Sequence, residues 1–522
     1  PLLLCYRSLH EMRMGALADG RLLDLLRRIA TFGVTLVRLD IRQESDRHTL
    51  ALHEITESLG LGGYADWDEE QRVRFLVGEL EGRRPLIPMD FAPSPETREV
   101  LDTFAAVAKV HPESLGAYVI SMAKQPSDVL AVCLLQREAG VRPPLRVVPL
   151  FETLDDLNRA GSVMRQLLAL PWYRRAIPDR QEVMVGYSDS SKDAGQLASA
   201  WALYRAQEEI VSACQEAAVR PVLFHGRGGT VGRGGGPTYV AITSQPPGSV
   251  QGCLRVTEQG EMIQSKFGNP GIAFRSLELY VGASLEATLL GHAAPTGEQR
   301  DLISRLAKRA TAAYRGTLAR PGFVDYFRAV TPEAEFGRLN IGSRPSRRKV
   351  GGLETLRAIP WIFSWMQNRL ILPAWLGTGV ALQEALDDGL EPQLRDLYRS
   401  WPFFRSSLDM VEMVLAKAEP GVFSRYDQVL VPAELRHFGP GLLDDLRTTR
   451  EALQRITGKA ELLEDNPVLR RSIQVRNPYV DPINLLQVAL LERLRAGDED
   501  PVTLDALLVT INGIAAGMRN TG

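Results

Sequence analysis

The sequence predicts an α/β protein built on a parallel (β/α)8 barrel of the TIM type that carries many additional α-helices. Short apolar runs alternate with helical patterns in the first half of the chain, which is the order of βαβ units. Chemically reactive side chains follow several of these runs directly, and active sites assemble at the carboxyl ends of barrel strands. The second half has apolar residues at helical spacing, so we expect the chain to be predominantly helical.

Five apolar runs are predicted to be buried parallel strands. Such strands need no alternation of polar and apolar residues, because helices cover both of their faces. Helical patterns over residues 155–170 and 194–218 separate the later runs, as crossover helices of βαβ units do. The five predicted strands are residues 34–41, 117–122, 145–151, 182–187 and 221–224.

Five side chains with catalytic or binding potential lie at or just beyond the ends of predicted strands. A doubly wound sheet also gathers ligands at the carboxyl ends of its strands, so that fold is the alternative. The number of contributing strands favours a closed barrel over a single crevice. The five residues are Arg42, Glu152, Asp189, Lys192 and His225.

Beyond about residue 280 the chain is predicted to be mainly helical. The aromatic segment 360–375 includes Trp361, Trp365 and Trp375, which we predict to be core residues. We expect two regions, a barrel catalytic region with inserted helices over 1–380 and a helical region over 381–522 packed on it. The predicted helices are residues 277–291, 297–315, 381–398, 408–418 and 440–456.

Composition excludes several classes of protein. The chain has 522 residues, 45% of them hydrophobic, which is enough for a large core, and its formal charge of −2 gives no reason to expect a nucleic-acid partner. The four cysteines form no C-x-x-C pair, which favours a reduced cytoplasmic protein without structural zinc. We find no signal peptide and no uninterrupted apolar run long enough to span a bilayer, so no membrane partner is expected.

Residues 224–237, FHGRGGTVGRGGGP, form the most unusual stretch of the chain. They hold seven glycines and two arginines, and they follow a predicted strand. Arginine side chains among exposed backbone N–H groups suit phosphate and carboxylate oxygens, so we predict an anion-binding loop with His225 at its base. The alternative is a flexible surface linker. Neither G-x-G-x-x-G nor G-x-x-x-x-G-K-[ST] fits, so a dinucleotide fold and a P-loop are not supported.

Glu152 and Asp189 are carboxylates at the ends of successive predicted strands. Such a pair either holds a hard divalent cation or divides acid and base roles, and nearby cationic side chains favour Mg²⁺ or Mn²⁺ with an anionic substrate. For Asp189 alone, capping of the following helix is the alternative. Lys192 then lies near the metal. Further candidate anion-binding residues are Arg42, Arg227, Arg233, Arg344 and Arg357.

Nine segments resemble phosphoenolpyruvate carboxylase, and together they run nearly from end to end. The resemblance implies a homotetrameric cytoplasmic enzyme that needs Mg²⁺ or Mn²⁺. It converts phosphoenolpyruvate and bicarbonate to oxaloacetate and phosphate, through carboxyphosphate and an enolate, and it replenishes citric-acid-cycle intermediates. The segments are LDIRQES (39–45), LFETLDDL (150–157), GYSDSSKDAG (186–195), FHGRGGTVGRGGGP (224–237), SQPPGS (244–249), RVTEQGEMI (255–263), GSRPSRR (342–348), LRAIPWIFSWMQNR (356–369) and MRNTG (518–522).

The same resemblance implies roles for individual residues. The metal ligands are Glu152 and Asp189. The phosphate of phosphoenolpyruvate is bound by Arg42, Arg227, Arg357, Gly228 and Gly229. Bicarbonate or carboxyphosphate is oriented by His225 and Arg233, with Lys192, Arg227 and Arg344 as further catalytic groups. A feedback site for aspartate or malate, in the region 381–522, is formed by Lys417, Arg476 and Asn520, with Arg233.

One departure concerns a second catalytic histidine, which the family carries in a T-A-H-P-T-E motif that does not occur here. The chain begins at Pro1, in a segment that resembles the middle of the full enzyme. We therefore expect the C-terminal two thirds of the protein, with impaired turnover unless an N-terminal segment completes the subunit. The alternatives are a non-catalytic or regulatory fragment, or another barrel enzyme that uses phosphoenolpyruvate.

Overall fold

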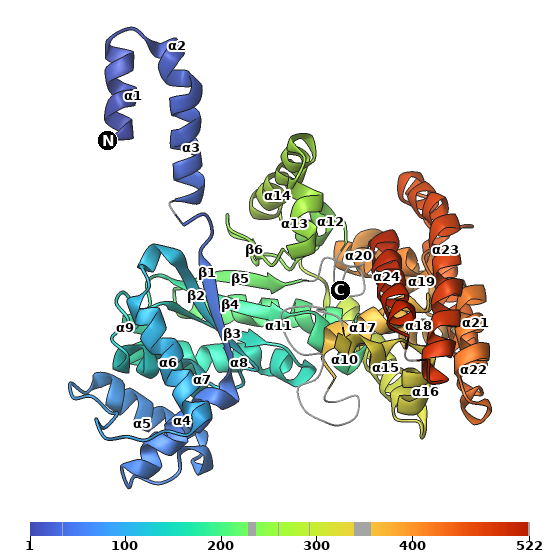
Figure 1. Ribbon diagram of the computed structural model, residues 1–522, viewed down its shortest axis with the longest axis horizontal. Helices are drawn as coiled ribbons and strands as arrows, with labels where there is room; N and C mark the ends of the chain where they lie inside the picture. Colours follow the sequence, from blue (N-terminus) through green and yellow to red (C-terminus); the bar gives the residue numbers. More distant parts are fainter. Residues whose placement is uncertain are drawn as a thin grey trace. The chain divides into compact units, whose positions relative to one another are not determined.

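The structure is a computed structural model that describes residues 1–33, 35–227, 236–258, 260–291, 293–338, 356–498 and 500–519 (Figure 1). The chain divides into two compact units. Unit 1 comprises Pro1–Leu150 and Gln166–Pro178, and unit 2 comprises Phe151–Arg165 and Asp179–Gly522. The predicted division between residues 1–380 and 381–522 follows a different line, and it stays a prediction.

Unit 1 contains three parallel strands with helices between them. Strand β1 (Leu39–Glu44) pairs with β2 (Leu115–Ser121), and β2 pairs with β3 (Arg146–Phe151), whose last residue already belongs to unit 2. Strands β2 and β3 have buried apolar residues on both of their faces, as predicted. The helices are α1 (Leu2–Glu11), α2 (Gly15–Leu17), α3 (Leu23–Phe32), α4 (Ser45–Ser58), α5 (Glu69–Glu81), α6 (Pro95–Lys109), α7 (Pro126–Glu138) and α9 (Pro171–Ala176).

The first strand lies later in the sequence than predicted. The expected strand 34–41 is instead 39–44, so Arg42 lies within β1 and pairs in register with Val119, not beyond the strand end. Leu36 has a positive φ of 65° and is 67% exposed, which is incompatible with a buried strand. Pairing begins with Leu39 opposite Leu115, and Asp40 Oδ1 accepts a hydrogen bond of 2.9 Å from the Ala117 N–H where the register then shifts.

Unit 2 contains the other described strands. Strand β4 (Arg180–Gly186) pairs in parallel with β5 (Arg220–Gly226) over the full length of both, and β5 pairs with β6 (Arg255–Val256). His225 is therefore the penultimate residue of β5 and lies at the strand end, because the strand extends two residues beyond the predicted 221–224. The two-residue strand β6 was not predicted, since so short a segment carries no periodic signal.

Helices follow and surround these strands. Helix α8 (Leu154–Ala169) begins three residues after β3, while α10 (Ser188–Ala194) and α11 (Gln196–Glu216) follow β4. The predicted helix 194–218 begins later because Gly195, with φ of +81°, separates α10 from α11. The remaining helices nearest the strands are α12 (Thr238–Thr243), α13 (Gly260–Phe267) and α14 (Pro270–Leu289).

The rest of unit 2 is a helical assembly, as predicted. The expected helix 381–398 is two helices, because Gly389 has φ of +77° and ends the first of them. The helices are α15 (Gly297–Leu318), α16 (Phe323–Val330), α17 (Ala358–Gln367), α18 (Thr378–Asp387), α19 (Glu391–Ser400), α20 (Pro402–Leu415), α21 (Pro420–Leu430), α22 (Phe438–Thr457), α23 (Pro467–Arg495) and α24 (Pro501–Met518).

The tryptophans of segment 360–375 are core residues, which confirms the prediction. Trp361, Trp365 and Trp375 are completely buried. The rings of Trp361 and Trp365 pack edge to face at 5.8 Å, and Phe327 lies 4.8 Å from Trp361. Each such ring contributes roughly 1.5–3 kcal/mol by leaving water. This cluster joins α16 and α17, and α17 in turn packs against α10.

At the level of fold class, the α/β prediction is confirmed. The described strand pairs are parallel, helices follow the strands, and the chain is mostly helical. A closed eight-stranded barrel is not established by the described strands, and it stays a proposal.

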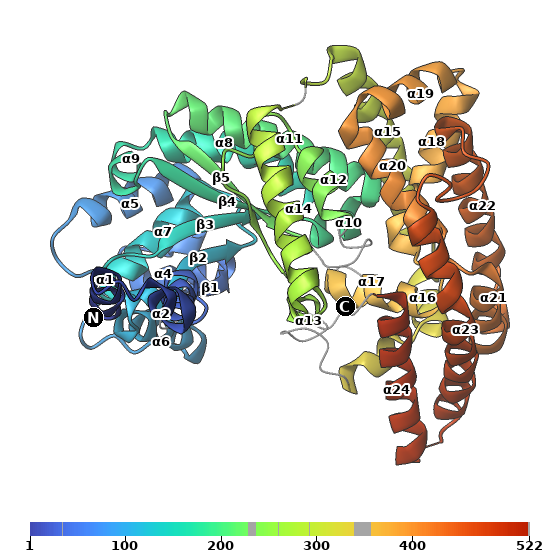
Figure 2. The ribbon, with the colours of Figure 1, turned by 90° about the horizontal axis from the view of Figure 1, so that it is seen from above.

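Helix α24 is the one described helix whose length and composition would allow it to cross a bilayer. A core helix of a soluble protein passes the same test, so this is weak evidence for a membrane. Leu507, Ile511 and Ile514 are completely buried, and α24 lies beside α23 in both Figure 1 and Figure 2.

The contact between α18 and α22 depends on Gly379. A Cβ atom added there would lie 2.6 Å from the Cα of Thr449, well inside van der Waals distance. We expect Gly379→Ala to lower the free energy of unfolding by about 1–3 kcal/mol, measured by urea denaturation. As a control, Gly282→Ala in the middle of α14, where nothing described lies within 4 Å, should raise it by about 1 kcal/mol. Equal effects of the two changes would contradict this account.

Candidate functional site

Glu152 and the carboxyl end of β4 are in direct contact. Glu152 directly follows β3 and is 3% exposed. A Cβ atom at Gly186, the last residue of β4, would lie 3.1 Å from the Cα and 3.3 Å from the Cγ of Glu152. Only glycine allows this approach without displacing the glutamate. The backbone that carries Glu152 therefore lies against the strand that leads, three residues later, to Asp189.

Asp189 and Lys192 are three residues apart on the short helix α10, so their side chains lie on the same side of it. Both are partly exposed, whereas Ser190 and Ser191 between them are buried. Ser190 Oγ donates a hydrogen bond of 2.8 Å to the Gly186 carbonyl, which holds the helix against the end of β4. The Tyr314 hydroxyl donates to the Lys192 carbonyl at 2.9 Å. These bonds fix the direction in which α10 presents its charged residues.

Asp193 joins the two sides of the site, and the sequence analysis did not single it out. Its Oδ2 accepts a hydrogen bond of 3.3 Å from the Leu154 N–H, at the start of α8, and its Oδ1 pairs with Arg315 at 2.9 Å. The segment after Glu152 is thus connected to the helix that carries Asp189. The neighbouring acidic and serine residues in the sequence concealed this role, because any of them could cap a helix.

His225 is buried next to Tyr187. Its side chain is 1% exposed, and Nδ1 lies 2.9 Å from the Tyr187 hydroxyl. Burial, reinforced by the Arg227 charge, lowers the pKa of His225 to about 3, while burial raises the pKa of Tyr187. With the Tyr187 phenol as the donor to Nδ1, the single ring proton would lie on Nε2. Nε2 makes no hydrogen bond within the described residues.

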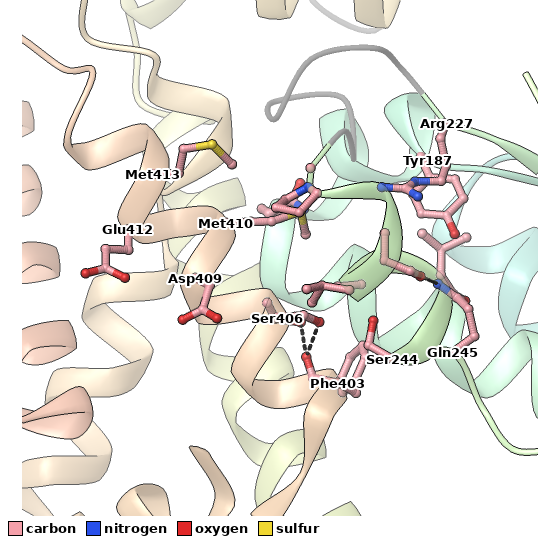
Figure 3. A pocket seen from close by; sticks show the side chains of 18 of the residues that line it. Tyr187, Arg227, Ser244, Gln245, Phe403, Ser406, Asp409, Met410, Glu412 and Met413 are labelled. Carbon is pink, nitrogen blue, oxygen red and sulfur yellow. Dashed lines mark hydrogen bonds between the residues drawn. The ribbon is translucent and has the colours of Figure 1, made fainter. Parts of the chain in front are cut away.

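Arg227 follows β5 and lies beside Tyr187, as Figure 3 shows. Both side chains line a cavity of about 230 Å³ within unit 2.

Arg357 is the residue before α17, the helix that packs against α10. Arg42 lies on β1, in unit 1. Four predicted site residues and one predicted effector residue lie outside the described residues, namely Gly228, Gly229, Arg233, Arg344 and Asn520.

A second group of cations surrounds Lys417. Burial, together with Arg476 and Arg519, lowers the pKa of Lys417 to about 8, and burial also lowers the pKa of Arg476. Arg476 is held in place, since its NH1 donates to the Gly517 carbonyl at 2.7 Å. This arrangement brings two of the predicted effector residues, Lys417 and Arg476, into one electrostatic environment.

Arg369 is hydrogen-bonded to the segments that carry these cations, and it was not predicted from the sequence. It is completely buried, and its Nε donates to the Lys417 carbonyl at 3.2 Å. Its other nitrogens contact Asp481 at 2.6 Å and Asn477, the neighbour of Arg476, at 3.2 Å. One guanidinium therefore connects the segments that carry Lys417 and Arg476. No local sequence pattern distinguishes such an arginine from a surface one.

The residues near Glu152 fit a divalent cation of the magnesium type. Hard cations of this kind are bound by one or two carboxylates, with water and substrate oxygens completing the shell. Glu152 lies against Gly186, three residues before Asp189, and Lys192 lies one turn beyond Asp189. In the described part of the chain there is no cluster of three or more His, Cys, Asp or Glu side chains, so a zinc-type site is not indicated there.

Known proteins are similar to the whole chain. A model of the phosphoenolpyruvate carboxylase family matches residues 1–522. Proteins named phosphoenolpyruvate carboxylase from Ectopseudomonas mendocina (strain ymp) and Stutzerimonas stutzeri (strain A1501) are 57% and 56% identical to the chain over 525 residues. Each match covers 100% of the chain and 60% of the relative, so the chain spans about 60% of the length of these curated relatives.

The buried environment of His225 has a measurable consequence. Its folded-state pKa of about 3 lies below the value of about 6.5 for an unfolded histidine, so the unfolded chain takes up a proton that the folded protein does not. Stability is therefore lost as the pH falls from 6.5 towards 3, by about 2 kcal/mol at pH 5. We expect the ring NMR signals of His225, assigned with His225→Gln, to show no titration between pH 8 and 5. A midpoint near pH 6.5 would contradict the proposed neutral state.

Proposed function

The chain belongs to the phosphoenolpyruvate carboxylase family, and from this we propose that the protein containing it carboxylates phosphoenolpyruvate with bicarbonate, forming oxaloacetate and phosphate. One observation carries the proposal: the Gly186 contact brings Glu152 to the strand that precedes Asp189 and Lys192. We further propose that the protein is a cytoplasmic homotetramer that replenishes citric-acid-cycle intermediates. The chain would supply the metal site, most of the substrate-binding residues and the effector site.

Glu152 and Asp189 would hold Mg²⁺ or Mn²⁺. When bound, the ion would supply positive charge to substrate oxygens and so favour the build-up of negative charge during phosphoryl transfer. The role of this chain's residues is to place two carboxylates at one point. Asp193 supports that placement, because it binds both the start of α8 and Arg315.

The cationic residues would bind the phosphate and balance its charge. Lys192 lies one helical turn from Asp189, and Arg357 precedes the helix that packs against α10. Arg227 extends from the end of β5. Planar guanidinium groups suit bidentate binding of phosphoryl oxygens. We propose the same role for Arg42, Gly228 and Gly229, with Arg344 as a further catalytic cation.

His225 would orient bicarbonate or the carboxyphosphate formed from it. Because its ring is neutral and Tyr187 occupies Nδ1, the Nε2 proton can be donated to an anionic oxygen without loss of a charge. A charged imidazolium would release its proton more readily and could protonate the nucleophile. Arg233 would assist by pairing with the same anion. The burial of His225 also limits access of water to an intermediate that hydrolyses easily.

Lys417 and Arg476 would bind a dicarboxylate inhibitor, aspartate or malate, together with Asn520 and Arg233. Burial and the Arg476 and Arg519 charges lower the pKa of Lys417, while burial, Arg519 and Arg369 lower the pKa of Arg476, which supports a group of partly desolvated cations that repel one another. A dianion relieves this repulsion when it binds. Arg369 acts as a positioning residue, since it holds the backbone of Lys417 and the neighbour of Arg476.

The metal proposal predicts the behaviour of two conservative variants. Glu152→Gln and Asp189→Asn each remove one carboxylate charge, so each should weaken Mn²⁺ binding at least tenfold, about 1.4 kcal/mol. Binding can be followed by the loss of the electron paramagnetic resonance signal of free Mn²⁺, which needs no turnover. Asp155→Asn is the matched control, because Asp155 is exposed, three residues from Glu152, and should leave binding unchanged. Unaltered Mn²⁺ affinity in both test variants would refute the assignment.

The effector proposal predicts that Lys417→Ala raises the aspartate concentration for half inhibition by about 10–100-fold, since a charged hydrogen bond is lost. The measurement is oxaloacetate formation by the complete enzyme at increasing aspartate, with the rate in its absence as reference. Arg471→Ala is the control, because Arg471 is exposed on the same helix as Arg476. Unchanged inhibition of Lys417→Ala would count against the site.

A further inference from the structure

A cavity in unit 2 extends from the candidate site into the helical assembly. It has a volume of about 230 Å³ and lies between α11, α12 and α20, with residues 463–469 at its far side. Figure 3 shows Tyr187 and Arg227 on one side and Asp409, Met410 and Met413 of α20 on the other. The space is larger than a single water requires, and a small organic molecule can occupy it.

The cavity contains a buried acceptor that lacks a partner. Gln207 of α11 lines the cavity and is 2% exposed, and its Oε1 makes no hydrogen bond with any residue in the described ranges. Buried amide oxygens are nearly always hydrogen-bonded, so an orphaned one indicates a group that binds there. The required group is a hydrogen-bond donor.

Three of the donors that line the cavity are already used. The hydroxyls of Ser406 and Ser407 both donate to the Phe403 carbonyl, at 3.0 and 2.8 Å (Figure 3). The Gln245 side-chain amide donates to the Ala241 carbonyl at 2.5 Å. A ligand with hydrogen-bond donors finds an unused acceptor in Gln207 Oε1 and carboxylates on these walls.

Carboxylates of α20 and of residues 463–469 give part of the cavity wall a negative character. Asp409, Glu412 and Asp465 all line it. Lys459 Nζ lies 3.9, 2.7 and 2.8 Å from them respectively, Arg405 lies 3.9 Å from Asp409, and Asp409 also accepts a hydrogen bond of 2.7 Å from the Tyr398 hydroxyl, so three carboxylates share two cations. Burial, Glu412 and Asp465 together raise the pKa of Asp409, even though Tyr398 and Lys459 oppose this rise. Another cation near Asp409 would relieve this shortage of positive charge.

The remaining walls are apolar. Aliphatic, aromatic and thioether side chains from all three helices and from the far side form them, and methionine side chains adapt to ligands of different shape. These residues are Leu203, Val240, Phe403, Met410, Met413 and Leu469.

We propose that this cavity is a binding site for a small amphipathic cation, a primary amine on a short alkyl chain. The ammonium carries three donors, which match Gln207 Oε1 and the Asp409 carboxylate, and the alkyl chain covers the apolar walls. Arg227 borders the site, and it is the one residue of the cavity lining that we have also assigned to metal, substrate or dicarboxylate inhibitor. The proposal does not depend on the proposed reaction, because it concerns binding alone.

The test uses n-hexylammonium chloride as the probe, with 1-hexanol and sodium hexanoate as neutral and anionic analogues of the same chain. Binding to the protein is measured by isothermal titration calorimetry at pH 7. Hexylammonium should bind at least tenfold more tightly than either analogue. Equal affinities for the three compounds, or tighter binding of hexanoate, would overturn the proposal.

Variants locate the binding site. Asp409→Asn and Gln207→Leu should each weaken hexylammonium binding about tenfold, and Ala241→Leu should weaken it by filling the space. The matched controls are Asp396→Asn and Gln393→Leu, which make the same changes at exposed positions of α19 and should leave binding unaltered. Circular dichroism verifies that each variant is folded. If Asp409→Asn does not fold, Gln207→Leu and Ala241→Leu still decide, and wild-type affinity in both overturns the proposal.

Discussion

The contact between Gly186 and Glu152 is the constraint on which the candidate site depends. Two strand ends can bring their following residues together only if no side chain intervenes, and a Cβ atom at Gly186 would lie 3.1 Å from the Cα of Glu152. The Asp193 carboxylate then fixes the spacing, because it binds the start of α8 with one oxygen and Arg315 with the other. A site for a hard cation needs this precision, since two carboxylates repel each other until the cation is present.

Desolvation has opposite consequences in the two regions that we propose to bind anions. Around His225 it removes a charge, because a buried imidazole next to Arg227 stays neutral and becomes a fixed hydrogen-bond donor. Around Lys417 the cations stay close to one another, and Arg369 holds the backbone of Lys417 and the side chain of Asn477, the neighbour of Arg476, while Asp481 balances only part of the charge. The first arrangement suits an anion that must be oriented without being protonated. The second suits an anion with two negative charges, which offsets the repulsion.

Much of the fold could be predicted from the sequence, because buried parallel strands and amphipathic helices have distinct apolar patterns. Four of the five strands and most helices lie within a few residues of their predicted positions. The first strand was displaced because an apolar run in an exposed segment, with Leu36 in the left-handed region, resembles a buried strand. Glycines with positive φ divided one predicted helix, at Gly389, and delayed the start of another, at Gly195. Such errors arise where a backbone angle decides the bounds of a strand or helix, because composition reflects backbone angles only weakly.

The sequence by itself determined the types of group available: the paired carboxylates after successive strands, the glycine-rich anion segment and the family. Only the tertiary structure decided which of these groups meet. It placed Glu152 against β4, buried His225 beside Tyr187, and assigned Asp193 and Arg369 to positions that join distant segments. It also opened a cavity between α11 and α20, helices about 200 residues apart. The physical reason is that charge, desolvation and steric contact depend on distances in space, which local sequence patterns do not specify.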